Sequence, residues 1–181
     1  MTNLWGNFYQ KKLNDSYLSY LKSSYSPFIN EINGLLRKGF KVAEMGCGMG
    51  NITKILHESR DDFNSICFDN NVDMLRLSEF NLGNDFIVRK HDIVNLLEES
   101  FDLIHSHGVL EHLSIDEMKQ VIKNQLKMSK RLVHYVPTSK YSYKSFGDEK
   151  LLSIKEWKEA LNPDESIDFN NSKDLILIWN K

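Results

Sequence analysis

Three glycines spaced two residues apart, Gly46, Gly48 and Gly50, constrain this chain more than any other feature. The strand candidate Lys41–Glu44 precedes them, and a helical pattern follows at once. Glycines between a strand and a helix make a turn whose backbone can approach a ligand that side chains would keep away. The sequence therefore predicts a ligand-binding loop, and the residues around the loop indicate which ligand it holds.

Short apolar runs alternate with helical patterns along the chain. We expect strands at Lys41–Glu44, Ser65–Phe68, Phe86–Lys90, Leu103–Ser106, Leu132–Val136, Ile167–Asn170 and Leu175–Trp179. We expect helices at Asn51–Arg60, Val72–Phe80, Ile115–Met128 and Ile154–Leu161. This alternation is typical of an α/β fold with a mostly parallel sheet and helices on both faces. Only Asn170–Lys173 separates the last two strands, too few residues for a parallel crossover, so these strands should form an antiparallel hairpin.

The predicted architecture is a single doubly wound, Rossmann-like domain over residues 1–181, with a seven-stranded sheet. Residues 1–39 should form an N-terminal helical cap, broken near Pro27, and residues 40–181 the cofactor-binding core. The cap is rich in aromatic side chains, namely Trp5, Phe8, Tyr9, Tyr17, Tyr20 and Tyr25. These either pack the cap on the sheet or form a lid over a ligand at the strand ends.

Composition excludes several classes of protein. The chain has 23 basic and 25 acidic residues, which gives no electrostatic case for general binding to nucleic acid or to a membrane surface. No apolar run approaches the roughly 20 residues that span a bilayer, and the N-terminus does not resemble a signal peptide. Two cysteines, Cys47 and Cys67, lie in or beside predicted strands without zinc-binding spacing. A reducing cytoplasmic location and the absence of a metal are therefore the expectations.

Acidic residues near the glycine loop indicate the ligand. Asp69 lies 19 residues after Gly50, at the end of the next predicted strand, where an acid can accept both hydroxyls of a ribose. The loop is not a dinucleotide fingerprint, because Asn51 stands where that pattern needs its third glycine. Glu44 enters the turn and suits a cationic ligand better than a phosphate. A nucleoside with positive charge fits both acids, and S-adenosylmethionine is such a ligand.

Three segments resemble the class I S-adenosylmethionine-dependent methyltransferases. Val42–Gly50 resembles the first motif of that family, Cys67–Leu75 its second-strand segment and Phe101–Leu113 its fourth-strand segment. The terminal hairpin matches the antiparallel last strand of the family. The resemblance covers roughly residues 40–180.

The resemblance implies roles in cofactor binding. Glu44 and the backbone of Gly46, Cys47 and Gly48 should hold the methionine part, with Cys47 as a small residue beside the cofactor. Asp69 should bind the ribose hydroxyls. Ser106, at the end of the fourth strand, should present its carbonyl group to the methionine ammonium.

The same resemblance places the adenine. Asn70 should lie beside the adenine, Asp92 should face its amino group, and the backbone of Ile93 should lie near the ring. Met74 is either a core residue or lies under the adenine. Asp92 could also serve only as a helix or turn cap.

A methyltransferase needs no recognisable catalytic group, since its main task is to hold a nucleophile in line with the methyl carbon. His112 is the best candidate for a general base, and it could equally be an orienting or structural residue. His105 and His107 alternate on the fourth predicted strand, but the sequence nominates no third residue that would make them a metal site.

The expected reaction is methyl transfer to an O, N or C nucleophile of a small molecule. Tyr141, Tyr143 and Phe146 could form an apolar wall of the acceptor site. One alternative is an RNA or protein methyltransferase, although the Pro-Pro tetrapeptide of amino-methylating nucleic-acid enzymes is absent. Another is a non-catalytic scaffold that binds S-adenosylmethionine, because a fold does not fix a function.

Overall fold

The computed structural model describes residues 11–142, 144 and 148–181. The chain divides into two compact units, Met1–Ile93 and Val94–Lys181. Several of the aromatic residues named above lie outside the described residues, namely Trp5, Phe8, Tyr9, Tyr143 and Phe146.

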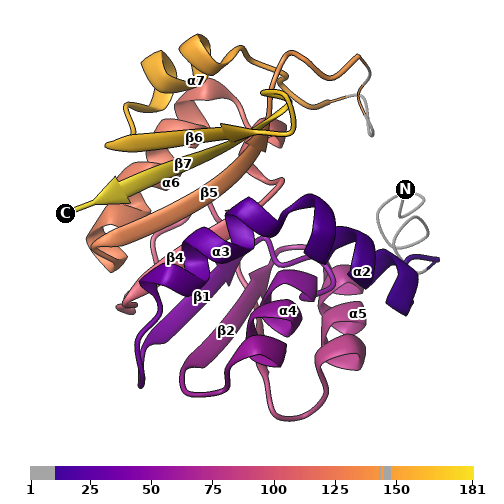
Figure 1. Ribbon diagram of the computed structural model, residues 1–181. Helices are drawn as coiled ribbons and strands as arrows, with labels where there is room; N and C mark the ends of the chain where they lie inside the picture. The colour runs from indigo at the N-terminus through magenta and orange to yellow at the C-terminus, as the bar shows by residue number, and fades with distance from the viewer. Residues whose placement is uncertain (1–10, 143, 145–147) are drawn as a thin grey trace. The chain divides into compact units, whose positions relative to one another are not determined.

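Parallel strands form the sheet of the first unit. They are β1 (Lys41–Met45) and β2 (Asn64–Asp69), both labelled in Figure 1, and β3 (Ile87–Lys90), in the order β3-β2-β1. Met45 pairs with Phe68, and Asp69 pairs with Lys90. Because parallel strands end at the same edge of a sheet, the residues that follow β1, β2 and β3 lie close to one another.

Two helices follow the first two strands of this unit. The helix α4 (Asn51–Ser59) begins directly after Gly50 and buries Ile52, Ile55 and Leu56. The helix α5 (Val72–Leu82) is capped by Asn71, whose side chain accepts hydrogen bonds from the amides of Asp73 and Met74. Such caps are worth about 1 kcal/mol and fix where a helix begins.

Two helices precede β1 in the described part of the chain. The helices α2 (Asp15–Ser24) and α3 (Ser26–Leu35) both contact α4. The break between them lies at Tyr25, and Pro27 stands in the first turn of α3, where a proline is tolerated.

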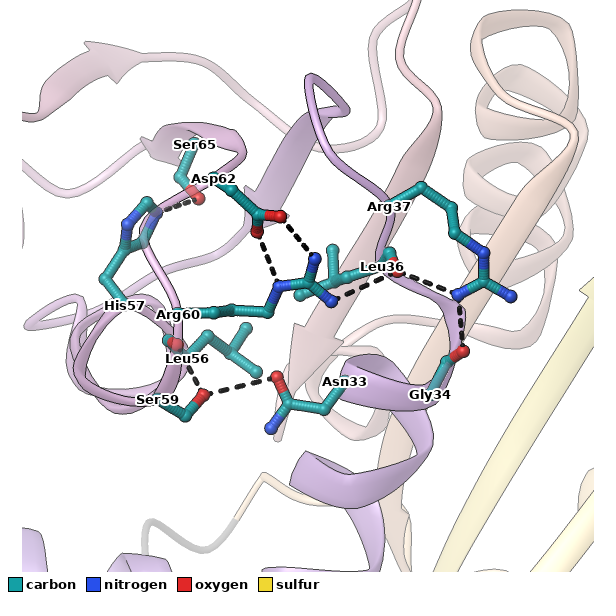
Figure 2. Close-up of polar contacts among 10 residues, drawn as sticks. All are labelled: Asn33, Gly34, Leu36, Arg37, Leu56, His57, Ser59, Arg60, Asp62 and Ser65. Carbon is teal, nitrogen blue, oxygen red and sulfur yellow. Dashed lines mark hydrogen bonds and ion pairs between the residues drawn. The ribbon is translucent and has the colours of Figure 1, made fainter.

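Hydrogen bonds join α3 and α4 to the segments beside them (Figure 2). Arg60 donates to both carboxylate oxygens of Asp62, at 2.6 and 2.8 Å, and to the carbonyl of Leu36 at 3.2 Å. Ser59 donates to the side chain of Asn33 at 3.4 Å. These contacts hold the end of α4 against the chain that leads into β1.

The second unit has a mixed sheet. Its strands are β4 (Leu103–His107), β5 (Arg131–Pro137), β6 (Glu165–Phe169) and β7 (Asp174–Asn180), in the order β4-β5-β7-β6 (Figure 1). β4 and β5 are parallel, whereas β7 is antiparallel to both of its neighbours. The predicted hairpin is confirmed, and Asn170, Asn171 and Ser172 in its turn have positive φ.

Three helical segments complete the second unit. They are the 3-10 helix η1 (Leu110–His112), α6 (Ile115–Met128) and α7 (Ile154–Leu161). Ser114 and Ser153 form the capping boxes that begin α6 and α7. Trp157 of α7 is fully buried and donates from its indole to the carbonyl of Pro137 at 3.0 Å.

The alternation of strands and helices, followed by an antiparallel pair, confirms the predicted α/β fold class. The predicted helices α6 and α7 have the observed bounds, and the strands differ from prediction by one or two residues at their ends.

Candidate functional site

The glycine loop lies between β1 and α4. Gly46, Gly48 and Gly50 have φ values of 70°, 54° and 72°, which glycine adopts without strain. The amides of Gly46 and Cys47 both donate to the carbonyl of Phe68 at 2.8 Å. These two amides therefore tie the loop to the end of β2, and the loop carbonyls are the groups that can accept a bond from a ligand ammonium.

Asp69, the last residue of β2, is held by backbone amides. Its Oδ2 accepts from Gly48 at 2.9 Å and its Oδ1 accepts from Asn71 at 2.9 Å. The side chain is largely buried, and this desolvation raises its pKa, while the backbone amides act against the rise. Each oxygen of a carboxylate can accept a second hydrogen bond, so Asp69 keeps the capacity to bind two hydroxyl groups.

Gly48 and Gly50 differ in what surrounds them. A methyl group on Gly48 would meet no heavy atom within 4 Å. A methyl group on Gly50 would lie 2.6 Å from Cδ1 of Leu82 and 2.9 Å from Oγ of Ser78. Gly48 therefore borders open space that a ligand can enter, whereas Gly50 is required where α4 approaches α5.

Glu44 lies in β1 with only 2 % of its surface exposed. Its Oε2 accepts from the amide of Thr53 at 3.0 Å and from the Thr53 hydroxyl at 2.6 Å. Burial raises the pKa of Glu44 to about 7, although the bonds from Thr53 act in the opposite direction. Glu44 thus supports the first turn of α4, and the role predicted for it at the methionine part of a ligand stays a prediction.

Cys47 points into a small apolar cluster with Cys67 and Leu82. Both cysteines are free and buried. The neighbouring Cys67 thiol and burial raise the pKa of Cys47, so its thiol stays protonated and is a poor nucleophile. The side chain of Cys47 packs the loop onto the sheet.

The residues predicted near an adenine lie after β2 and β3. Asn70 and Asp92 are exposed, and Ile93 is half-buried. The amide of His91 donates to the carbonyl of Asp69 at 2.9 Å, which brings the segment after β3 next to the end of β2. Met74 is 3 % exposed, as a core residue would be.

Ser106 lies inside the sheet of the second unit, one residue before β4 ends. It is fully buried, and its hydroxyl bonds to Nδ1 of His134 at 2.7 Å. His105 and His134 are buried too, His107 is half-buried, and desolvation lowers the pKa of each to about 3. These imidazoles are therefore neutral at physiological pH.

His112 ends η1, and its side chain is 18 % exposed. Its Nδ1 bonds to Oδ1 of Asp148 at 2.9 Å. The preceding residue, Glu111, is buried, and burial raises its pKa to about 8. Sequence reasoning identified His112 beside Glu111 but not Asp148, because Asp148 is 36 residues away in the chain.

Tyr141 is half-buried, and its hydroxyl donates to Oδ1 of Asp174 at 2.7 Å. The hydroxyl of Tyr135 donates to the same oxygen at 2.7 Å. Both tyrosines thereby hold the start of β7. Tyr141, predicted above as part of an apolar wall of the acceptor site, thus also has a structural role.

The combination of a glycine loop after β1 and an amide-bound aspartate at the end of β2 defines the cofactor half of a Rossmann-like methyltransferase fold. Residues 43–131 match the model of a family described as a methyltransferase domain. This segment is therefore a methyltransferase domain, which confirms the resemblance read from the three motifs and the predicted enzyme class.

Solved structures agree on the fold. The PH0226 protein from Pyrococcus horikoshii OT3 is 14 % identical, with a TM-score of 0.75 over 96 % of this chain and 98 % of that one. An S-adenosylmethionine-dependent methyltransferase from Clostridium acetobutylicum ATCC 824 is 14 % identical, with a TM-score of 0.68 over 92 % and 98 %. DhpI, solved in complex with SAH, is 13 % identical, with a TM-score of 0.74 over 96 % and 92 %.

These comparisons support S-adenosylmethionine as the cofactor, as the motifs predicted. None of the curated proteins compared with the chain matches it. In the part of the chain that the structure describes, no helix is long and apolar enough to cross a bilayer.

Proposed function

We propose that the chain transfers the methyl group of S-adenosylmethionine to an O, N or C nucleophile of a small molecule by in-line displacement. The methyltransferase family supports the reaction. The nearly balanced charge, 23 basic against 25 acidic residues, favours a small acceptor over nucleic acid.

The observation that carries the cofactor proposal is the setting of Asp69. Two backbone amides, from Gly48 and Asn71, hold its carboxylate at the end of β2, beside the open space at Gly48. A carboxylate fixed in this way can bind the two ribose hydroxyls without losing further side-chain entropy. The residues present thus fit the nucleoside part of S-adenosylmethionine.

We assign the remaining cofactor contacts to the same unit. The carbonyl groups of the Gly46–Gly48 loop face the methionine ammonium, and Glu44 favours its positive charge from behind the loop. Asn70, Asp92 and the backbone of Ile93 line the adenine. Ser106 and His112 belong to the second unit, and their roles at the ammonium and as a general base remain predictions.

When bound, S-adenosylmethionine supplies a sulfonium methyl group that needs no metal or acid to activate it. The protein then has to hold the acceptor atom in line, about 3–3.5 Å from the methyl carbon. A base helps only if the nucleophile arrives protonated.

Isothermal titration calorimetry with S-adenosylmethionine and with its demethylated product tests the cofactor proposal. Binding of both ligands with one site per chain is expected. If neither ligand gave heat or a thermal shift at millimolar concentration, the proposal would be wrong.

A second assay tests the acceptor class. The enzyme is incubated with methyl-labelled cofactor and a cell extract separated into small molecules, RNA and protein. Label in the small-molecule fraction supports the proposal. Label only in RNA or protein would overturn it, and cofactor binding without any turnover would support a scaffold.

A further inference from the structure

Three potential metal ligands meet in the second unit. His112, Asp148 and Glu149 each offer one ligand atom, and these atoms lie within 4.8 Å of one another. Nδ1 of His112 and Oδ1 of Asp148 are 2.9 Å apart. This is a hydrogen-bond distance, and it is also about the separation of two neighbouring ligands in an octahedral site, each about 2.1 Å from the ion.

The backbone holds this cluster together independently of the side chains. The amide of Lys150 donates to the carbonyl of Glu111 at 2.7 Å, and the amide of Ser139 donates to the carbonyl of Leu152 at 2.8 Å. The first bond places Asp148 and Glu149 beside η1. The ligands therefore come from two segments that the chain itself fixes next to each other.

A fourth side chain gives an independent reason to expect a cation. Glu111 is only 4 % exposed, and its Oε2 is buried without a hydrogen-bond partner. Its Oε1 lies 3.9 Å from Nε2 of His112, so the carboxylate faces the imidazole of the cluster. A buried carboxylate with an unpartnered oxygen is costly, and a metal ion on Nδ1 favours the Nε2–H form of His112, which carries a donor on the side of this carboxylate.

The donor set indicates which cations fit. One imidazole nitrogen with carboxylate oxygens suits Zn²⁺ or Mn²⁺, whereas Ca²⁺ takes six to eight oxygens. Asp148 is exposed, while Glu149 is buried. Such a site has an open side toward solvent and a closed side toward the core.

We propose that His112, Asp148 and Glu149 bind a divalent transition-metal ion, with Glu111 beside the imidazole as a supporting carboxylate. This assignment rests on residues of the second unit alone, and a metal ion on His112 would replace the general-base role predicted for it; because its test measures metal binding, its failure is distinguishable from failure of the proposed methyl transfer. His112 thereby becomes a metal ligand. The sequence did not suggest this role, because it predicted no metal.

Titration of the full chain with MnCl₂ and with ZnCl₂, followed by calorimetry and by the electron paramagnetic resonance of free Mn²⁺, tests the site. One bound ion per chain is expected. Asp148→Asn and Glu149→Gln should each weaken binding about tenfold or more. Asp168→Asn is the matched control, since Asp168 is another exposed acid of this unit that bonds to one neutral side chain, Ser172, and it should bind as the unchanged chain does.

The paramagnetism of bound Mn²⁺ also shows where on the chain the ion lies. Its paramagnetism should broaden the amide signals of Glu111, His112 and Lys150 first, at substoichiometric amounts, and those of Asp168 and Ser172 less. Uniform broadening, equal affinity of Asp148→Asn and the control, or no saturable binding of either metal would each overturn the proposal. Because Asp148 is exposed, its asparagine variant should fold, so lost binding would not be explained by unfolding.

Discussion

The amide of Gly48 donates a 2.9 Å hydrogen bond to Oδ2 of Asp69, which joins the loop after β1 to the last residue of β2. The amide of Asn71 holds the other oxygen. A single side chain therefore sets the shape of the loop and the place of the proposed ribose site.

Asp69→Ala should weaken the binding of S-adenosylmethionine tenfold or more, about 1.4 kcal/mol, because a charge-assisted contact is lost and the loop is released. Calorimetry measures the affinity. Asp73→Ala is the control, since Asp73 lies four residues on and pairs with exposed Arg76, 3.4 Å away. Equal affinities of the two folded variants would remove Asp69 from the site.

Gly50→Ala should unfold at lower denaturant concentration than Gly48→Ala. The new methyl group at residue 50 meets Leu82 at 2.6 Å, and overpacking of this kind costs about 1–3 kcal/mol on top of the left-handed backbone. At residue 48 the space is open, so only the backbone strain of about 1–2 kcal/mol remains. Urea denaturation compares the two.

The same pair of variants separates folding from binding. Gly48→Ala should stay folded and bind S-adenosylmethionine more weakly, because its methyl group occupies the space proposed for the ligand. Unchanged affinity in Gly48→Ala would show that the ligand does not approach this residue.

Stability should depend on pH through Glu44. Its pKa is about 7 in the folded chain against an ordinary 4.5, so the folded state keeps this proton to higher pH than the unfolded chain. The contribution of Glu44 is therefore most favourable below about pH 4.5 and falls as pH rises to about 7, by on the order of 1–3 kcal/mol. Glu44→Gln should remove this fall. Urea denaturation of the unchanged chain and of the variant, each at pH 5 and at pH 7.5, measures the change in the free energy of unfolding between the two pH values. The same change in both proteins would contradict the prediction.

Three imidazoles should remain neutral in mild acid. Burial lowers the pKa of His105, His107 and His134 to about 3, so protons favour the unfolded chain below its histidine pKa of about 6.5. Each histidine thus lowers the free energy of unfolding as pH falls below that value, by up to about 1.4 kcal/mol per pH unit. Imidazole ¹⁵N spectra of the folded protein at pH 5 should show these three uncharged; protonation of any of them in the folded state would be the contrary result.

Local patterns predicted most of the fold. Ser114 and Ser153 marked the first residues of α6 and α7 because a capping box acts within four residues. A break near Pro27 is predicted, and it lies two residues earlier, at Tyr25, because a proline is tolerated in the first turn of the helix that follows. The 3-10 helix η1 was not predicted, since three residues carry no periodicity.

The candidate site was predicted in part. Asp69 and Gly48 follow from motif spacing, and the structure joins them. The packing of Gly50 against Leu82 could not be predicted, because it depends on how α4 and α5 approach each other. The meeting of His112 with Asp148 depends on a chain reversal through α6 and β5, which no local pattern encodes.

The unequal surroundings of Gly48 and Gly50 bear on how such loops change over time. Gly50 is constrained by the packing of α4 against α5, whereas Gly48 is constrained by the ligand proposed to fill the open space beside it. A homologue in which Gly48 is replaced and Gly50 is kept could therefore fold well and no longer bind the cofactor. A pattern search that scores the glycines alike would rank that homologue beside active enzymes.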